Sequence, residues 1–140
     1  MTDDELAAAV RAAVFDRDLA DMPDGFDTVV GPRGYRLSGG QVQRLAAARM
    51  FARDSDLLVI DDLSSALDNL TETTILRNLS QLAASGRTVL MVSNRREALA
   101  RADTVLLLDG GCITGAGPLD QLLRDSAAVQ GIWQSGRPRG

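Results

Sequence analysis

A candidate anion-binding site lies at Ser38, Gly39, Gly40 and Gln41. Ser is favoured at the residue that caps a helix, and two glycines allow a ligand to approach the backbone closely. The segment 41–53 that follows is rich in Ala and contains neither Pro nor Gly, so we expect a helix to begin at the glycines. The free N–H groups and the positive dipole end of such a helix favour an anion such as a phosphate. An ordinary capped surface helix is the alternative interpretation of the same residues.

A second candidate site consists of two adjacent carboxylates, Asp61 and Asp62. They follow the apolar run 57–60, which is typical of a fully buried parallel strand. Parallel sheets bind ligands at the carboxyl ends of their strands, where carboxylates suit a hard cation such as Mg²⁺. The pair is also compatible with a strand that simply ends in solvent.

The chain lacks two residue types that often take part in phosphate chemistry. All fifteen basic residues are Arg, so the chain has no Lys, and it has no His. A phosphate-binding loop of the form G-x-x-x-x-G-K-[ST] needs its Lys to reach the β- and γ-phosphates. Such a loop therefore does not exist within this chain.

Periodicity and turn residues predict an α/β chain with alternating helices and strands. Two apolar runs, 57–60 and 88–92, are expected to be buried strands of one doubly wound sheet, and the run 105–108 is expected to be its third strand. Gly86 marks the end of one predicted helix, and Gly110 and Gly111 predict a hairpin turn into 112–114. The predicted helices cover residues 5–14, 41–53, 68–84, 97–102 and 118–123, and residues 26–36 are expected to form a loop.

The charge and composition argue against some classes of protein, such as those that bind nucleic acids or span a membrane. The net charge of −4 and the lack of a basic cluster argue against a nucleic acid as partner. The longest apolar runs are far too short for a transmembrane span. A single Cys112 cannot form an internal disulfide, which fits a reducing, cytoplasmic setting.

The pentapeptide Leu37–Gln41 resembles the LSGGQ signature of ATP-binding cassette (ABC) ATPases, and three further motifs follow it in the order of that family. The run 57–62 resembles a Walker B element, the run 64–68 resembles the D-loop, and the run 92–95 resembles the switch segment. The resemblance implies a partial P-loop NTPase fold, with a helical subdomain and the later strands of the parallel core sheet. It also divides the chain into a helical, signature-bearing subdomain at 1–54, a partial ATPase core at 55–125 and a C-terminal tail at 126–140.

The resemblance implies roles for individual residues. The signature residues Ser38, Gly39, Gly40 and Gln41 would contact ATP held by a partner domain, and Ser65 and Asp68 of the D-loop would lie at the same interface. Asp61 would be the acid associated with Mg²⁺ through water. Asp62 stands where the family usually has the Glu that polarises the attacking water, and Asn94 stands where it usually has His. Asp is one methylene shorter than Glu, and Asn cannot carry a proton, so both differences predict slow hydrolysis.

The predicted function is that of a portion of an exporter-like ABC ATP-binding subunit, which acts with ATP and Mg²⁺ in a complete dimer. Its partners would be another nucleotide-binding domain, arranged head to tail, and the transmembrane domain of a transporter. Pro32 replaces the Glu of the loop that faces the transmembrane domain in exporters. The chain would then be cytoplasmic and peripheral to the membrane, with little ATPase activity of its own.

Two other functions remain open at this point. A non-catalytic partner that regulates an intact ABC ATPase would also carry the differences at Asp62 and Asn94. A portion of a DNA-repair or chromosome-structure ATPase would carry the signature too, but the long heptad tracts of such proteins are missing here.

Overall fold

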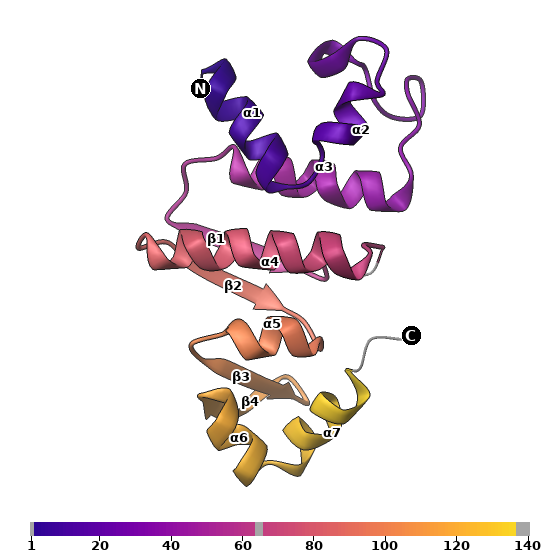
Figure 1. Cartoon of the computed structure of the whole chain (residues 1–140). Coiled ribbons are helices and arrows are strands. Elements are labelled where there is room, and N and C mark those ends of the chain that lie inside the picture. The colour runs from indigo at the N-terminus through magenta and orange to yellow at the C-terminus, as the bar shows by residue number, and fades with distance from the viewer. Residues whose placement is uncertain (1, 64–65, 137–140) are drawn as a thin grey trace. The chain divides into compact units, whose positions relative to one another are not determined.

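The computed structural model describes residues 2–63 and 66–136, in two compact units, Met1–Leu90 and Met91–Gly140. Figure 1 labels the helices and strands of both units. The mixture of helices and short strands agrees with the α/β class that the sequence predicts.

The first unit begins with four helical elements. These are α1 (Asp3–Ala12), α2 (Asp16–Ala20), the 3-10 turn η1 (Gly25–Asp27) and α3 (Gly39–Phe51). The backbone of Val14 has a φ of 56°, which an α-helix cannot contain, so the predicted helix 5–14 ends early and α2 starts afresh. The helix predicted from 41 to 53 is confirmed, and it begins at Gly39 as expected.

Helix α1 is the centre of the first unit, because it contacts α2, α3 and α4 (Asn69–Ala84). The packing is dense at this centre: Ala13 and Ile75 are fully buried and Phe15 is 2% exposed. Figure 1 shows α1 and α3 lying side by side. Helix α4 ends as predicted, since Gly86 follows it with a φ of 99° that suits glycine.

Strands β1 (Leu57–Asp61) and β2 (Thr88–Val92) are hydrogen-bonded neighbours in a two-stranded sheet. The expectation of fully buried strands is wrong. In β1, Leu58 and Ile60 are buried, but Leu57 is 51% and Val59 is 61% exposed. Alternate side chains of a strand point to opposite faces, and among the described residues only one face of β1 is covered.

The second unit contains α5 (Arg96–Arg101), β3 (Val105–Asp109), β4 (Cys112–Gly117), α6 (Leu119–Asp125) and α7 (Ala127–Ser135). The hairpin turn is confirmed: β3 pairs with β4 in antiparallel fashion through Gly110 and Gly111, whose φ values are 54° and 78°. The prediction that 105–108 joins the sheet of 57–60 and 88–92 is wrong, because the tight turn gives β3 a partner immediately next to it in sequence.

A small apolar core holds the second unit together. Val105, Leu122 and Val129 are buried there, so β3, α6 and α7 all contribute to it. Helix α7 differs from the tail expected at 126–140, and it starts where the hydroxyl of Ser126 accepts a hydrogen bond from the amide of Val129.

Candidate functional site

The N-terminus of α3 is built by a reciprocal pair of hydrogen bonds between Ser38 and Gln41. The Ser38 hydroxyl accepts from the Gln41 amide at 3.3 Å, and the Gln41 side-chain oxygen accepts from the Ser38 amide at 2.8 Å. This capping box satisfies two of the amides at the helix start. The amides of Gly39 and Gly40 have no acceptor among the described residues, so they are available to an anion outside the chain.

The two glycines also lie against the segment that begins at Ala66. A Cβ built on Gly40 would come within 2.9 Å of the Ala66 carbonyl oxygen, whereas one on Gly39 would meet only the Ala66 Cβ at 3.6 Å. The side-chain oxygen of Gln43 accepts a hydrogen bond from the Ala66 amide at 3.1 Å. The start of α3 and the segment at Ala66 therefore pack together within the first unit, and a side chain at position 40 would disturb that packing.

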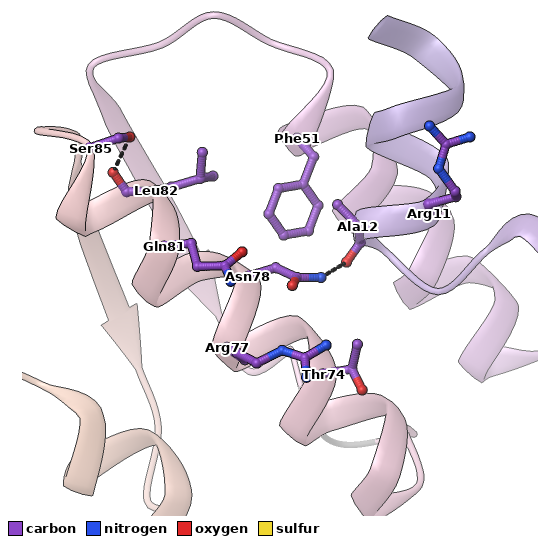
Figure 2. A pocket seen from close by; sticks show the side chains of 9 residues that line it. All are labelled: Arg11, Ala12, Phe51, Thr74, Arg77, Asn78, Gln81, Leu82 and Ser85. Atoms are coloured by element: carbon purple, nitrogen blue, oxygen red, sulfur yellow. Dashed lines mark hydrogen bonds between the residues drawn. The ribbon is translucent and has the colours of Figure 1, made fainter. Parts of the chain in front are cut away.

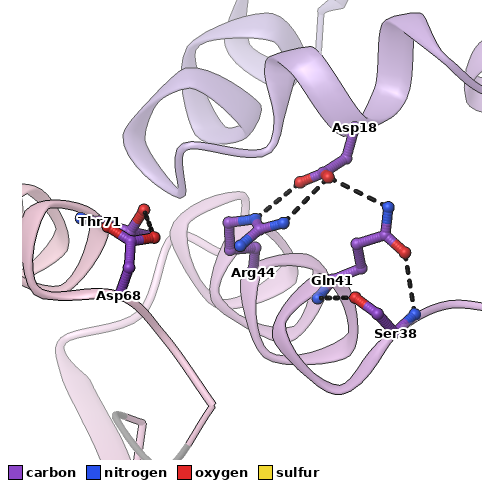
Figure 3. Close-up of polar contacts among 6 residues, drawn as sticks. All are labelled: Asp18, Ser38, Gln41, Arg44, Asp68 and Thr71. Atoms are coloured by element: carbon purple, nitrogen blue, oxygen red, sulfur yellow. Dashed lines mark hydrogen bonds and ion pairs between the residues drawn. The ribbon is translucent and has the colours of Figure 1, made fainter.

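Asp18 in α2 holds the side chains of Gln41 and Arg44, as Figure 3 shows. The Arg44 guanidinium donates to the Asp18 carboxylate at 2.6 and 2.9 Å, and the Gln41 amide group donates to it at 3.2 Å. The hydrogen bond to Asp18 raises the pKa of Arg44 above its ordinary value. Asp18 was not predictable as part of this site, because no local sequence pattern connects residues 26 positions apart.

Asp68 lies at the start of α4 and caps it. Its carboxylate accepts hydrogen bonds from the Leu70 amide at 3.1 Å, the Thr71 amide at 3.0 Å and the Thr71 hydroxyl at 2.7 Å. The hydrogen bond from the Thr71 hydroxyl is the largest cause that lowers the pKa of Asp68 below its ordinary value of 3.8. Asp68 is therefore an ionised helix cap at neutral pH. The candidate residue Ser65 lies outside the described residues.

The two carboxylates after the first strand are both exposed. Asp61 is the last residue of β1, and Asp62 follows it with a φ of 47°, in the left-handed region. Asp adopts this region more readily than most residues do. Within the described part of the chain, no three His, Cys, Asp or Glu side chains are grouped as metal ligands.

Asn94 belongs to the second unit, in the short connection between β2 and α5. It is exposed, and the hydroxyl of the preceding Ser93 accepts a hydrogen bond from the Arg95 amide at 3.1 Å. The chain around Asn94 is thus bent by a local side-chain-to-backbone hydrogen bond.

An open hollow of about 610 Å³ lies elsewhere in the first unit, between α1, α4 and Phe51. None of the candidate residues lines it. Figure 2 shows that polar groups at its wall are already used: the Asn78 side chain donates to the Ala12 carbonyl at 2.8 Å, and the Ser85 hydroxyl donates to the Leu82 carbonyl at 2.7 Å. The hollow is therefore separate from the start of α3.

Several known proteins are similar to this chain in sequence. No model of a protein family matches the chain. The ATP-dependent lipid A-core flippase of Burkholderia pseudomallei is 44% identical over 120 residues, which are 86% of this chain. A probable multidrug resistance ABC transporter ATP-binding/permease protein, YheI of Bacillus subtilis, is 38% identical over 89% of this chain. Over most of its length, this chain is homologous to ABC exporter ATP-binding proteins.

The structure agrees with this relationship. A bacterial Atm1-family ABC exporter, solved with ATP bound, matches 99% of the chain with a TM-score of 0.84 and 34% identity. The chain spans about a fifth of the length of the curated relatives, 20% of the flippase and 21% of YheI, and 24% of the solved exporter chain. Among the described residues of this ABC exporter homologue, no helix has the length and apolar character that crossing a membrane requires.

Proposed function

We propose that this chain is the signature-bearing part of an ABC exporter ATP-binding subunit, and that Ser38, Gly39, Gly40 and Gln41 contact Mg-ATP held by another nucleotide-binding domain. The observation that carries the proposal is the pair of glycine amides at the start of α3, which have no acceptor among the described residues. Backbone amides at a helix N-terminus are a natural partner for phosphate oxygens. The homology to ABC exporters supports ATP as the source of that phosphate.

The packing of Gly40 on Ala66 supports a shared interface for the signature and the D-loop-like segment. Both lie in the first unit, and Gln43 connects them through its hydrogen bond to the Ala66 amide. A partner domain that approaches the start of α3 therefore also approaches the segment 66–68. We place Asp68 and Ser65 at this interface by resemblance, with Asp68 acting at the same time as the cap of α4.

The chain's own contribution to hydrolysis is proposed to be small. It has no Lys for a phosphate-binding loop, so the nucleotide would be held by other residues. Asp61 would associate with Mg²⁺ through water, and Mg²⁺ would neutralise phosphate charge. Asp62 would orient the attacking water less well than a Glu, and Asn94 would offer a hydrogen bond but no proton.

A second candidate function is supported by Asp62 and Asn94. Asp62 and Asn94 both differ from the residues usual in a competent ABC ATPase, which favours a non-catalytic partner that regulates an intact one. In such an asymmetric dimer, the signature residues of this chain would complete the intact partner's site. Its own site would stay weak.

The exposed side chains of β1 fit a chain that works within a larger assembly. Leu57 and Val59 are more than half exposed, although a strand of this composition is usually covered on both faces. We propose that the remainder of an ATP-binding subunit covers this face. The second partner would be the transmembrane domain of a transporter, which would hold this chain on the cytoplasmic side of the membrane.

The test combines the purified chain with an intact nucleotide-binding domain from a homologous ABC exporter. By calorimetry, the chain alone should show no saturable binding of Mg-ATP in the micromolar range. In the mixture, the chain should raise ATP turnover by the intact domain. Ser38→Arg should abolish this effect, because it places a long cation over the two glycine amides.

The matched control is Ser55→Arg, the same change just beyond the opposite end of α3. It should leave the stimulation intact. Micromolar ATP binding by the chain alone would contradict the proposal that other residues than those of this chain hold the nucleotide. Equal effects of Ser38→Arg and Ser55→Arg would contradict the role of the signature residues.

A further inference from the structure

The end of α7 lies directly against the backbone of Asn94. A Cβ built on Gly136 would come within 2.6 Å of the Asn94 carbonyl oxygen, which is closer than real side chains approach. The φ of Gly136 is −74°, a value open to any residue. Glycine is therefore required here by the close approach of two segments, and its conformational freedom is not the reason.

A second contact joins the same two segments through Arg96 and Trp133. The Arg96 Nε donates a hydrogen bond to the Trp133 carbonyl oxygen at 2.5 Å. The guanidinium carbon of Arg96 also lies 4.9 Å from the centroid of the Trp133 ring, within the range of a cation–π interaction. Arg96 is the first residue of α5, two positions after Asn94, so α7 contacts the chain both at Asn94 and just after it.

Helix α7 is itself fixed to the core of the second unit. Val129 is 2% exposed and packs with Val105 and Leu122, and α7 contacts α6. The cap from Ser126 fixes the first turn of α7. A helix anchored in this way is a rigid support for the segment that it touches.

We propose that α7 is a clamp that sets the position of Asn94, with Arg96, Trp133 and Gly136 as its positioning residues. The clamp holds the backbone at Asn94, while the side chain of Asn94 belongs to an exposed residue and stays accessible. Movement of α7 therefore moves Asn94. The consequence for nucleotide rests on the proposed function, in which Asn94 faces a phosphate, but the clamp itself does not.

The first test needs no nucleotide. The peptide unit between Asn94 and Arg95 carries the Asn94 carbonyl and an amide that donates to the Ser93 hydroxyl at 3.1 Å. Hydrogen exchange at this amide, measured by NMR on the full chain, reports whether the backbone at Asn94 is held. Arg96→Ala removes both the hydrogen bond and the ring contact with α7, so it should speed this exchange by about tenfold. Trp133→Ala removes only the ring contact, because Arg96 donates to the Trp133 backbone carbonyl, so it should speed the exchange less. Trp133 is the single tryptophan of the chain, so in Arg96→Ala its fluorescence reports the loss of the contact independently.

Conservative variants separate positioning from a general loss of structure. Trp133→Phe keeps an aromatic ring and Arg96→Lys keeps a cation, so both should restore much of the protection at Asn94. Arg101→Ala is the control, because Arg101 is an exposed cation at the far end of α5. Its exchange at Asn94 should equal that of the unchanged chain.

Gly136→Ala provides a variant that removes no buried group. It should shift the resonance of the amide in the peptide unit between Asn94 and Arg95 and speed its exchange, since a Cβ would press on the Asn94 carbonyl. Unchanged exchange at Asn94 in Arg96→Ala, Trp133→Ala and Gly136→Ala would overturn the clamp. Faster exchange throughout the second unit would also overturn it, because it would show only a structural role.

A second test separates the clamp from the proposed function. In the mixture with an intact nucleotide-binding domain, ATP turnover is measured with Arg96→Ala and with Ser38→Arg. Faster exchange at Asn94 in Arg96→Ala, with turnover that only Ser38→Arg lowers, supports both proposals, because the signature residues and not Asn94 complete the site of the intact domain. Faster exchange at Asn94 in Arg96→Ala, with turnover that Ser38→Arg leaves unchanged, supports the clamp and contradicts the proposed function.

Discussion

Asp18 accepts two hydrogen bonds from the guanidinium of Arg44, at 2.6 and 2.9 Å, and so connects α2 to the second turn of α3. The two side chains are only 15% and 18% exposed, which shields the ion pair from water. A shielded, two-pronged pair of this kind contributes more than an exposed salt bridge does. Since Asp18 also accepts from Gln41, it controls the residue that completes the cap of the signature helix.

Asp18→Ala should therefore destabilise the first unit by about 2 kcal/mol, because it leaves a mostly shielded guanidinium without its partner. Asp18→Asn keeps one acceptor and should cost about half as much. The free energy of unfolding in urea measures both. Asp16→Ala, at an exposed position in the same helix, is the control and should cost only a few tenths of a kcal/mol. Equal losses for Asp18→Ala and Asp16→Ala would contradict the importance of the pair.

The contrast between Asp18 and Ser38 shows what the sequence alone can predict. The cap at Ser38 involves residues three positions apart, so the pattern of residue types was sufficient to place the start of α3. The end of α4 at Gly86 was predictable for the same reason. Asp18 acts on residues 23 and 26 positions away, and only the folded chain brings them together.

Strand burial and α7 were beyond the sequence for different reasons. The apolar run of β1 predicted coverage on both faces, but coverage depends on the elements that pack there and not on the strand itself. Helix α7 did have a local signal, since Ser126 precedes Val129, Ile132 and Trp133 at helical spacing. That signal was overlooked because the segment was interpreted as a tail.

The two glycines of the signature should respond differently to the same substitution. Gly40→Ala places a Cβ 2.9 Å from the Ala66 carbonyl oxygen, so the segment at Ala66 has to move. We expect a loss of about 1–2 kcal/mol in the free energy of unfolding. Gly39→Ala meets only ordinary contact at 3.6 Å, and Ala favours the helix over Gly, so its stability should stay equal or rise by up to about 1 kcal/mol.

Thermal unfolding of the two alanine variants measures this difference. The hydrogen bond from the Ala66 amide to Gln43 gives a second readout, because its amide exchange should speed up only in Gly40→Ala. If the two variants had the same stability, the packing of Gly40 on Ala66 would be contradicted.

Asp68 should make the stability of α4 depend on pH. Its pKa in the folded chain lies below 3.8, so folding favours the ionised carboxylate. The stabilisation is therefore complete above the ordinary value and is lost as the pH falls through the lower, folded value. Asp68→Asn keeps a capping side chain but no charge, so its unfolding free energy should fall less between pH 5 and pH 3, by an amount on the order of a few tenths of a kcal/mol.

Thr71→Val tests the cause of that pH dependence. It removes the hydroxyl that donates to Asp68 at 2.7 Å and is the largest contributor to the lowered pKa. The acid-induced loss of stability should therefore also become smaller in this variant. If the acid-induced loss of stability were unchanged in both Asp68→Asn and Thr71→Val, the pH dependence would come from other carboxylates.

Asp62 links the backbone after β1 to the chemistry expected there. Its φ of 47° lies in the left-handed region, which Asn and Asp tolerate better than Glu. Asp62→Asn should leave stability nearly unchanged, whereas Asp62→Glu should cost up to about 1 kcal/mol although it keeps the charge. The free energy of unfolding in urea shows whether the backbone conformation or the charge is the cause. If the charge were the cause, Asp62→Asn would be the less stable of the two variants. If Asp62→Glu is the destabilised one, this backbone conformation disfavours the longer carboxylate, and the short reach of Asp62 follows from the local fold of the chain.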